Sequence, residues 1–336
     1  MEMSNRSLQN ATSKMEENEI LIKRGYYLRG IIGEGSYSKV RRAYSTQIKD
    51  DVAIKIIVRN LAPPVFRDKF LPREIQILSY IKHPNIINVY EIFETRRRPV
   101  GDTVYIVTEF VKCGDLLEFV KEKGAMPEQE ARNVLRDVIE AVTYLHDNDI
   151  THRDIKCENI LLDILPGRIG MGFTAKLCDF GFARRIPKLS ETVRTSAEEV
   201  ETIPKRSAGI SECSSGVSQE VYPAQTQLTK TFCGSAAYAA PEVLERRAHD
   251  PRAADIWAMG VVAFITLYGA MPYDDTDINA MVEIQRREEI PASKSRKIAR
   301  KARDLIKLAL KYEPTFRPCA KELLMHQWLQ ITANKH

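Results

Sequence analysis

The sequence lacks a hydrophobic run long enough to cross a membrane. Its most apolar stretch, residues 258–271, is 14 residues long and lies between Asp255 and Asp274, whereas a membrane-spanning helix needs about 20 apolar residues. The first 18 residues are polar and carry charges of both signs, so they lack the apolar core of a secretory signal. We therefore expect a cytoplasmic protein in which the stretch at 258–271 is a buried helix.

Paired cysteines and a strong excess of one charge are also missing. The six cysteines are scattered over both halves of the chain and never form a CxxC pair, which argues against a zinc site or a disulfide framework. Lysine and arginine number 50 against 45 aspartate and glutamate, an excess too small to suggest nucleic acid as the main partner. We expect free thiols and a monomer that binds neither nucleic acid nor a membrane.

The chain has 336 residues, about twice the length of an ordinary domain, which predicts two lobes. The first, over 26–111, is predicted to be β-rich, because short β-branched runs indicate antiparallel strands at 28–32, 52–58 and 104–110. A helix over 72–81 lies among them. The second lobe, over 112–329, is predicted to be α-rich. Its helical patterns span 128–146, 255–268, 277–286 and 302–311. The predicted fold class is α+β.

Three segments fit neither lobe. Residues 1–25 and 330–336 are expected to be a flexible N-terminal tail and a short C-terminal tail. Residues 185–228 hold 11 Ser or Thr, three prolines and few large apolar side chains. Such a segment cannot bury enough apolar surface to offset its ordering entropy, so we expect a mobile insertion.

A glycine-rich segment precedes a lysine and a glutamate that could act with it. Gly33-Glu34-Gly35-Ser36-Tyr37-Ser38-Lys39-Val40 lies between two predicted strands, although such a pattern alone more often marks a tight hairpin than a phosphate site. Lys55 ends an apolar strand, where a lysine is usually a snorkelling edge residue. Glu74 lies on the predicted helix that could reach it.

The decisive residues lie in the second lobe. His152-Arg153-Asp154-Ile155-Lys156-Cys157-Glu158-Asn159 precedes an apolar strand, and Asp179-Phe180-Gly181 stands twenty residues after Asn159. Ala240-Pro241-Glu242 and Asp255-Ile256-Trp257 follow. Each alone could arise by chance, but their joint order and spacing could not.

With these motifs the sequence resembles the eukaryotic protein-kinase family over residues 26–329. Three segments resemble the testis-specific serine/threonine kinases, a branch of the calcium/calmodulin-dependent kinase-like group. They are residues 70–74, 114–119 and 231–242. The resemblance implies a bilobal kinase fold, with one regulatory helix in the β-rich lobe, that transfers the γ-phosphoryl of Mg·ATP to Ser or Thr of protein substrates. A role in sperm development is also implied.

The family resemblance assigns a role to each candidate residue. Asp154 would orient the hydroxyl and accept its proton, Lys156 would steady the phosphoryl group, and Asn159 with Asp179 would bind Mg²⁺. The nucleotide-binding residues it implies are Ile32, Gly33, Glu34, Gly35, Ser36, Tyr37, Ser38, Lys39, Val40, Ala53, Lys55, Glu74, Thr108, Glu109, Val111, Asp115 and Leu161. Among these, Lys55 pairs with Glu74, and Thr108 gates the space behind adenine.

The resemblance also implies regulation. Phosphate on Thr231, added by an upstream kinase or by autophosphorylation in trans, would be bound by Arg153 and Arg184. The alternative is that Thr231 merely caps a turn. Cys178, beside the metal aspartate, has two interpretations: a thiol of lowered pKa facing the nucleotide, or a small buried apolar residue.

One departure and one rival function remain. Ser38 replaces the third glycine of the phosphate loop, and we expect activity to survive this change. The rival is a catalytically dead scaffold, but Lys55, Asp154, Asn159 and Asp179 are all present. A lipid or small-molecule kinase is disfavoured by Ala240-Pro241-Glu242.

Overall fold

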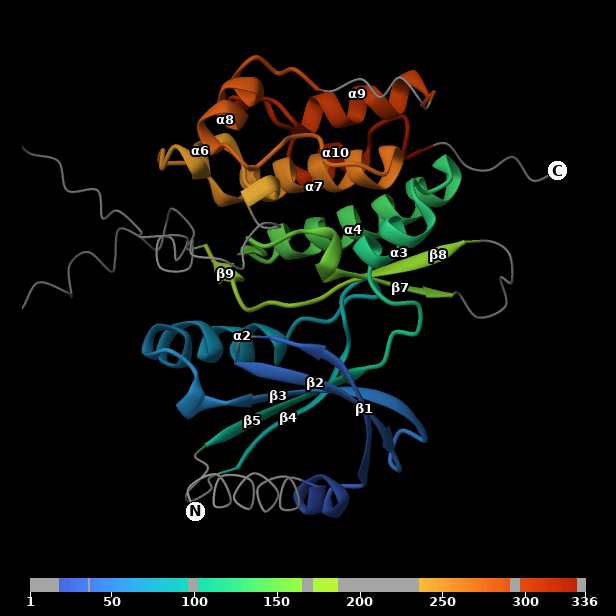
Figure 1. Ribbon diagram of the computed structural model, residues 1–336, viewed down its shortest axis with the longest axis vertical. Helices are drawn as coiled ribbons and strands as arrows, with labels where there is room; N and C mark the ends of the chain where they lie inside the picture. The colour runs from blue at the N-terminus through green and yellow to red at the C-terminus, as the bar shows by residue number, and fades with distance from the viewer. Residues whose placement is uncertain are drawn as a thin grey trace, which may run out of the picture.

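The computed structural model describes residues 18–35, 37–95, 102–164, 172–186, 236–290 and 297–330. These residues form two lobes stacked along the long axis of the molecule (Figure 1). One lobe is built on a β-sheet and the other on helices. The predicted α+β bilobal fold is therefore confirmed.

The first lobe contains a five-stranded antiparallel sheet in the order β1-β2-β3-β5-β4. The strands are β1 (Tyr26–Glu34), β2 (Ser38–Ser45), β3 (Asp50–Val58), β4 (Val89–Thr95) and β5 (Thr103–Glu109). The sequence predicted β1, β3 and β5 from their β-branched runs. It did not predict β2 and β4, because charged residues such as Arg41 and Glu91 interrupt their apolar pattern.

A continuous helical stretch follows β3. After the short turn η1 (Arg59–Leu61), the π-helical turn η2 (Phe66–Phe70) runs directly into α2 (Leu71–Leu78). The helix ends one turn before the predicted Ile81, and it buries Leu71, Glu74 and the two residues Ile77 and Leu78. Glu74 is therefore held on the face of α2 that meets the rest of the protein.

The residues just before β1 also pack against the sheet. Residues 18–23 are helical, and Leu21 is fully buried in an apolar cluster with Ile54, Phe93 and Tyr105. Arg24 lies over the Phe93 ring, 4.0 Å from its centroid, and forms an ion pair with Glu91. Residues 18–25 thus differ from the flexible tail expected there, because Leu21 and Arg24 both have partners on the sheet.

The second lobe is mostly helical. Its α-helices are α3 (Leu116–Lys123), α4 (Glu128–Asp147), α6 (Pro241–Leu244), α7 (Pro251–Tyr268), α8 (Ile278–Arg286), α9 (Arg300–Ala309) and α10 (Ala320–Leu324). Its shorter elements are β6 (Ile150–Thr151), η3 (Cys157–Asn159), β7 (Ile160–Ile164), β8 (Phe173–Leu177), β9 (Arg184–Arg185), η5 (Ala236–Tyr238) and η6 (Pro314–Phe316). Two antiparallel ribbons, β6-β9 and β7-β8, lie on the side of the second lobe that is nearest the first lobe (Figure 1).

Helix α7 forms the centre of this lobe, as its composition predicts. The Asp250 carboxylate caps its first turn by accepting from the Arg252 amide, and Gly269 ends it with φ +72°. Since α7 is apolar on nearly every side, it is stable only when surrounded by protein. Within the described ranges no helix is both long and apolar enough to span a bilayer.

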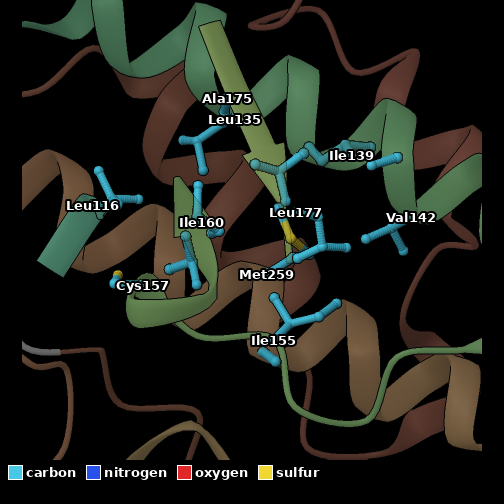
Figure 2. Packing of buried hydrophobic residues seen from close by; sticks show 14 of the residues in the cluster. Leu116, Leu135, Ile139, Val142, Ile155, Cys157, Ile160, Ala175, Leu177 and Met259 are labelled. Carbon is cyan, nitrogen blue, oxygen red and sulfur yellow. The ribbon is translucent and has the colours of Figure 1, made fainter. Parts of the chain in front are cut away.

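The core joins α4, α7 and the β7-β8 ribbon. Figure 2 shows Leu135, Ile139 and Val142 of α4 gathered around Leu177 of β8, with Met259 of α7 close by. The same cluster includes residues of the catalytic-loop sequence, such as Ile155. Buried apolar side chains of the core thus hold the segments that carry the candidate polar residues.

Candidate active site

Lys55 forms ion pairs with one residue of each lobe. Its Nζ lies 2.7 Å from Glu74 Oε1 on α2 and 3.1 Å from Asp179 Oδ1 in the second lobe. The Glu74 side chain is only 2% exposed, while that of Asp179 is 45% exposed. The predicted pair of Lys55 and Glu74 is therefore present, and Asp179 completes a three-residue ion cluster.

The charges in this cluster support one another. The neighbouring Lys55 ammonium lowers the pKa of the Asp179 carboxyl to about 2. Burial alone would lower the pKa of Lys55, but the charges of Asp179 and Glu74 outweigh it and raise that pKa. Burial raises the pKa of Glu74 although Lys55 opposes the shift. At neutral pH the site therefore presents a positive lysine beside an ionised aspartate.

Asp154 is held by two side chains of its own loop. The Asn159 amide nitrogen donates to the Asp154 carbonyl at 2.8 Å and to its Oδ2 at 3.0 Å. Lys156 Nζ lies 2.8 Å from the same Oδ2. The predicted catalytic residues Asp154, Lys156 and Asn159 thus form one hydrogen-bonded group. The Cys178 amide donates to the Asn159 carbonyl at 2.9 Å, which joins this group to the segment of Asp179.

The backbone of the site is strained and is fixed by Asp255 of α7. Arg153 and Asp179 adopt left-handed conformations, with φ of +67° and +60°, which non-glycine residues rarely do without surrounding support. The buried Asp255 carboxylate accepts from the His152 amide at 3.0 Å and from the Arg153 amide at 2.8 Å. His146 Nε2 lies 2.9 Å from the same carboxylate. Asp255 therefore holds the loop that presents Asp154.

His152 and Phe180 connect the Asp154 loop to the segment of Asp179. Their rings meet edge to face with centroids 5.0 Å apart, and Phe180 is fully buried. His152 Nε2 lies 3.1 Å from the Cys178 carbonyl. The segment of Asp179 is therefore fixed against the Asp154 loop.

The predicted adenine-contacting residues lie on strands of both lobes. Val40 on β2 pairs opposite Lys55, and Ala53 on β3 pairs opposite Thr108 on β5. From the other lobe, Leu161 on β7 bridges to Asp115 in the segment that connects the lobes. The register places Val40, Ala53 and Thr108 on the same face of the sheet as Lys55.

The glycine-rich hairpin closes on itself at its tip. Gly33 pairs opposite Val40, and the Gly35 amide donates to the Ser38 carbonyl at 2.8 Å. A Cβ on Gly35 would lie 2.9 Å from the Ser38 hydroxyl oxygen, so a larger residue would require the Ser38 side chain to shift. Ser38 itself lies in the extended strand β2, where glycine is not required.

Comparison with known proteins shows the family of this chain. The family model described as protein kinase domain matches residues 26–202 and 213–329. The chain belongs to the protein kinase family.

Its relatives narrow the class. Testis-specific serine/threonine-protein kinase 1 of Mus musculus is 40% identical over 319 residues, which cover 95% of this chain and 76% of the relative. Testis-specific serine/threonine-protein kinase 3 of the same species is 37% identical over 314 residues, covering 94% and 99%. Testis-specific serine/threonine-protein kinase 4 of Homo sapiens is 32% identical over 323 residues, covering 96% and 88%. The chain is a protein serine/threonine kinase.

Two predicted site residues of the kinase have structural partners that the sequence did not reveal. The Asp115 carboxylate caps α3 by accepting from the Glu118 amide at 2.8 Å. The Glu109 amide donates to the Asn88 carbonyl at 3.0 Å. Its carbonyl accepts from the Thr108 hydroxyl at 3.2 Å. The Asp115 carboxylate thus stabilises the start of α3.

Sequence reasoning missed the parts played by Tyr238 and Asp255. The Tyr238 hydroxyl donates to Glu158 Oε2 at 3.2 Å and accepts from the Cys157 amide at 3.4 Å. This contact joins η5, just before Ala240, to the catalytic loop. Both residues occur in the motifs noted above, but spacing alone gives no sign of hydrogen bonds across 80 or more residues.

Burial corrects one interpretation of Cys178. The expectation of a thiol with a lowered pKa is wrong, because burial raises the pKa of Cys178 and the Asp179 charge raises it further, while Lys55 opposes them only in part. The alternative, a residue packed against the apolar core, agrees with its contacts.

Ser36, Thr231 and nearly all of the predicted insertion lie outside the described residues. Arg185, its first residue, pairs with Ile150 in the β6-β9 ribbon.

Proposed function

We propose that this kinase binds ATP between the two lobes and that Asp154 orients the substrate hydroxyl and accepts its proton. The observation that carries the proposal is the ion cluster of Lys55, Glu74 and Asp179, joined through Cys178 and Asn159 to the Asp154 loop. Phosphoryl transfer depends mainly on positioning and on neutralising charge, and this group supplies both.

The nucleotide is proposed to lie with its adenine between Val40 and Ala53 on one side and Leu161 on the other. The backbone of Glu109 and Val111 would bind the adenine edge. The glycine-rich hairpin, from Ile32 to Val40, would cover the phosphates. Lys55 would place its ammonium against the α and β phosphates, while Glu74 keeps that ammonium in position.

Asn159 and Asp179 would hold Mg²⁺, and their chemistry fits this ion. The Asn159 amide nitrogen is engaged by Asp154, which leaves its oxygen as the ligand atom, and Asp179 is ionised at neutral pH. Among the described residues no three His, Cys, Asp or Glu side chains gather into a metal site. The remaining ligands would therefore be phosphate oxygens and water, as is usual for Mg²⁺. When bound, the ion neutralises the phosphate charge.

Asp154→Asn tests the proposed role of the carboxylate. Because general-base and positioning effects contribute about 10²–10⁴ in rate, we expect phosphate transfer to a basic protein substrate to fall by that order. Mg·ATP affinity should stay close to wild type. Asp147→Asn, an exposed aspartate at the end of α4, is the matched control. Full transfer activity in Asp154→Asn would reject the assignment, and an inactive wild type that still binds Mg·ATP would favour the scaffold alternative.

We further propose that phosphate on Thr231 switches the kinase on. The β6-β9 ribbon pairs Thr151 with Arg184, and Arg153 lies two residues beyond Thr151, so the two arginines lie on neighbouring segments of the chain. A phosphate facing an arginine pair gains about one to three charge-assisted hydrogen bonds. An upstream kinase or autophosphorylation in trans would add it. Unmodified Thr231 in active enzyme, together with full activity of Thr231→Ala, would refute this.

The setting is proposed from the relatives. Their names place testis-specific serine/threonine kinases in the testis, and we propose that this kinase acts in sperm development. We also propose that it works as a cytoplasmic monomer on protein substrates bearing Ser or Thr. Size-exclusion chromatography with light scattering tests the monomer, and localisation in germ cells tests the setting.

A further inference from the structure

Two aromatic contacts tie the start of the α2 stretch to two parts of the active site. The Phe66 and Tyr37 rings lie with centroids 5.8 Å apart, and Tyr37 belongs to the glycine-rich hairpin. The Phe70 and Phe182 rings meet edge to face with centroids 5.7 Å apart, and Phe182 follows Asp179-Phe180-Gly181. All four rings are half-buried.

Phe66 and Phe70 lie on the same continuous helical stretch. They bound the π-helical turn η2, in which the Leu71 amide donates to the Phe66 carbonyl. The helix continues from there to Glu74, one turn beyond Phe70. Single π-helical turns are rare and are frequent at functional sites. Here the turn separates two rings that engage different segments of the chain.

The second contact lies beside the Lys55 ion cluster. A Cβ on Gly181 would be 3.3 Å from Asp179 Oδ1 and 3.7 Å from Glu74 Oε2, so the chain after Asp179 passes close to α2. The ring of Phe182 extends this contact to Phe70. Movement of α2 away from the site would therefore separate Phe70 from Phe182 as well as Glu74 from Lys55.

We propose that Phe66 and Phe70 are positioning residues that form an aromatic clasp, with Phe66 acting through Tyr37 on the phosphate loop and Phe70 acting through Phe182 on the segment after Asp179. The clasp couples closure of the glycine-rich hairpin to the placement of α2. This inference rests on the proposed nucleotide site. Neither phenylalanine touches the reacting atoms, so each acts only through its ring partner.

A double-mutant cycle tests the first half of the clasp. Aromatic pairs contribute an energy equivalent to roughly a two- to tenfold change in an equilibrium constant. Phe66→Ala and Tyr37→Ala should each weaken Mg·ATP binding by about that factor, and the double variant should be no weaker than the more affected single variant. Phe66→Tyr, which keeps a ring, should restore affinity. Val65→Ala, at a neighbouring exposed residue, should bind Mg·ATP as wild type does.

Hydrogen exchange of the nucleotide-free protein tests both halves without relying on nucleotide. Exchange should accelerate at residues 33–38 in Phe66→Ala and at residues 179–186 in Phe70→Leu, and Phe70→Tyr should keep the protection of wild type. Unchanged exchange in Phe66→Ala and Phe70→Leu, or strictly additive effects in the cycle, would overturn the clasp. If wild type failed to bind Mg·ATP, the proposed nucleotide site would fail, while the exchange result would still decide whether the rings hold the two segments.

Discussion

The guanidinium of Arg317 and the carboxylate of Glu242 form a two-pronged ion pair that is sealed from solvent. The two N–O distances are 2.6 and 2.7 Å, and both side chains have zero exposure. Arg317 also donates to the carbonyls of Lys311, Tyr312 and Ala253. Its hydrogen bonds thus tie the start of α6 to the loop after α9.

This pair predicts an asymmetric response to mutation. Arg317→Met leaves the Glu242 carboxylate buried without its partner, and we expect a loss of about 3–5 kcal/mol in the free energy of unfolding. Arg317→Met combined with Glu242→Leu should recover much of that loss, because no buried charge remains. Urea unfolding measures both variants. Arg287→Met, which removes a surface pair with Glu283, should cost less than about 1 kcal/mol; equal losses at the two arginines would contradict the prediction.

Lys55→Met should change how stability depends on pH. The folded-state pKa of Asp179 is depressed to about 2, so its ion pair stabilises the protein above the ordinary aspartate pKa and the benefit is lost as the pH falls toward 2. Without Lys55, burial would raise the pKa of Glu74 further, which also favours the variant in acid. The stability difference between wild type and Lys55→Met should therefore shrink from pH 6 to the acid limit of the folded state. A difference that grew on acidification would refute this.

Thr108→Met should discriminate between inhibitors and ATP. Thr108 is small, and its hydroxyl donates to the Ala53 carbonyl at 3.4 Å, at the end of β5 beside the proposed adenine position. A methyl-sized change in an apolar pocket is worth about 1–3 kcal/mol. Compounds that reach past adenine should lose roughly 10-fold or more in affinity, while the KM for ATP stays within about twofold. Equal inhibition of both forms would show that Thr108 does not gate that space.

The thiols should react in the order of their exposure. Cys319 is exposed, Cys113 and Cys178 are partly buried, and Cys157 is buried. Burial raises the pKa of Cys178 and raises that of Cys157 to about 12, so both are protonated at neutral pH and react slowly. Timed alkylation with iodoacetamide, read by peptide mass, should modify Cys319 first and Cys157 only on unfolding. Rapid modification of Cys178 that Mg·ATP suppresses would instead place its sulfur at the nucleotide.

The sequence predicted those parts of the kinase that short motifs or a local repeat of apolar residues identify. Asp154, Asn159 and Asp179 were found by spacing, and the structure brings their segments together as expected. The long helices α4 and α7 were also predicted, because their apolar residues recur with helical spacing. Ala53 and Thr108 were implied by the family resemblance, and the structure pairs them across β3 and β5.

What could not be predicted depends on contacts between distant residues. The hydrogen bonds that the His152 and Arg153 amides donate to the Asp255 carboxylate span more than 100 residues, and no local pattern encodes them. The raised pKa of Cys178 depends on burial by its neighbours, whereas its position beside the proposed metal ligand Asp179 suggested the opposite. Strands β2 and β4 were hidden because charged side chains interrupt their apolar pattern.

The helical segment at 18–23 bears on where the folding unit begins. The family match starts at residue 26, but Leu21 fills the apolar surface around Ile54 and Phe93. A protein shortened to begin at Tyr26 would uncover that surface and give up the roughly 1.5–3 kcal/mol that a buried leucine contributes. Exposed apolar sheet surface also promotes self-association. The smallest well-behaved form of this kinase should thus keep residues 18–25, although they precede everything that family resemblance identifies.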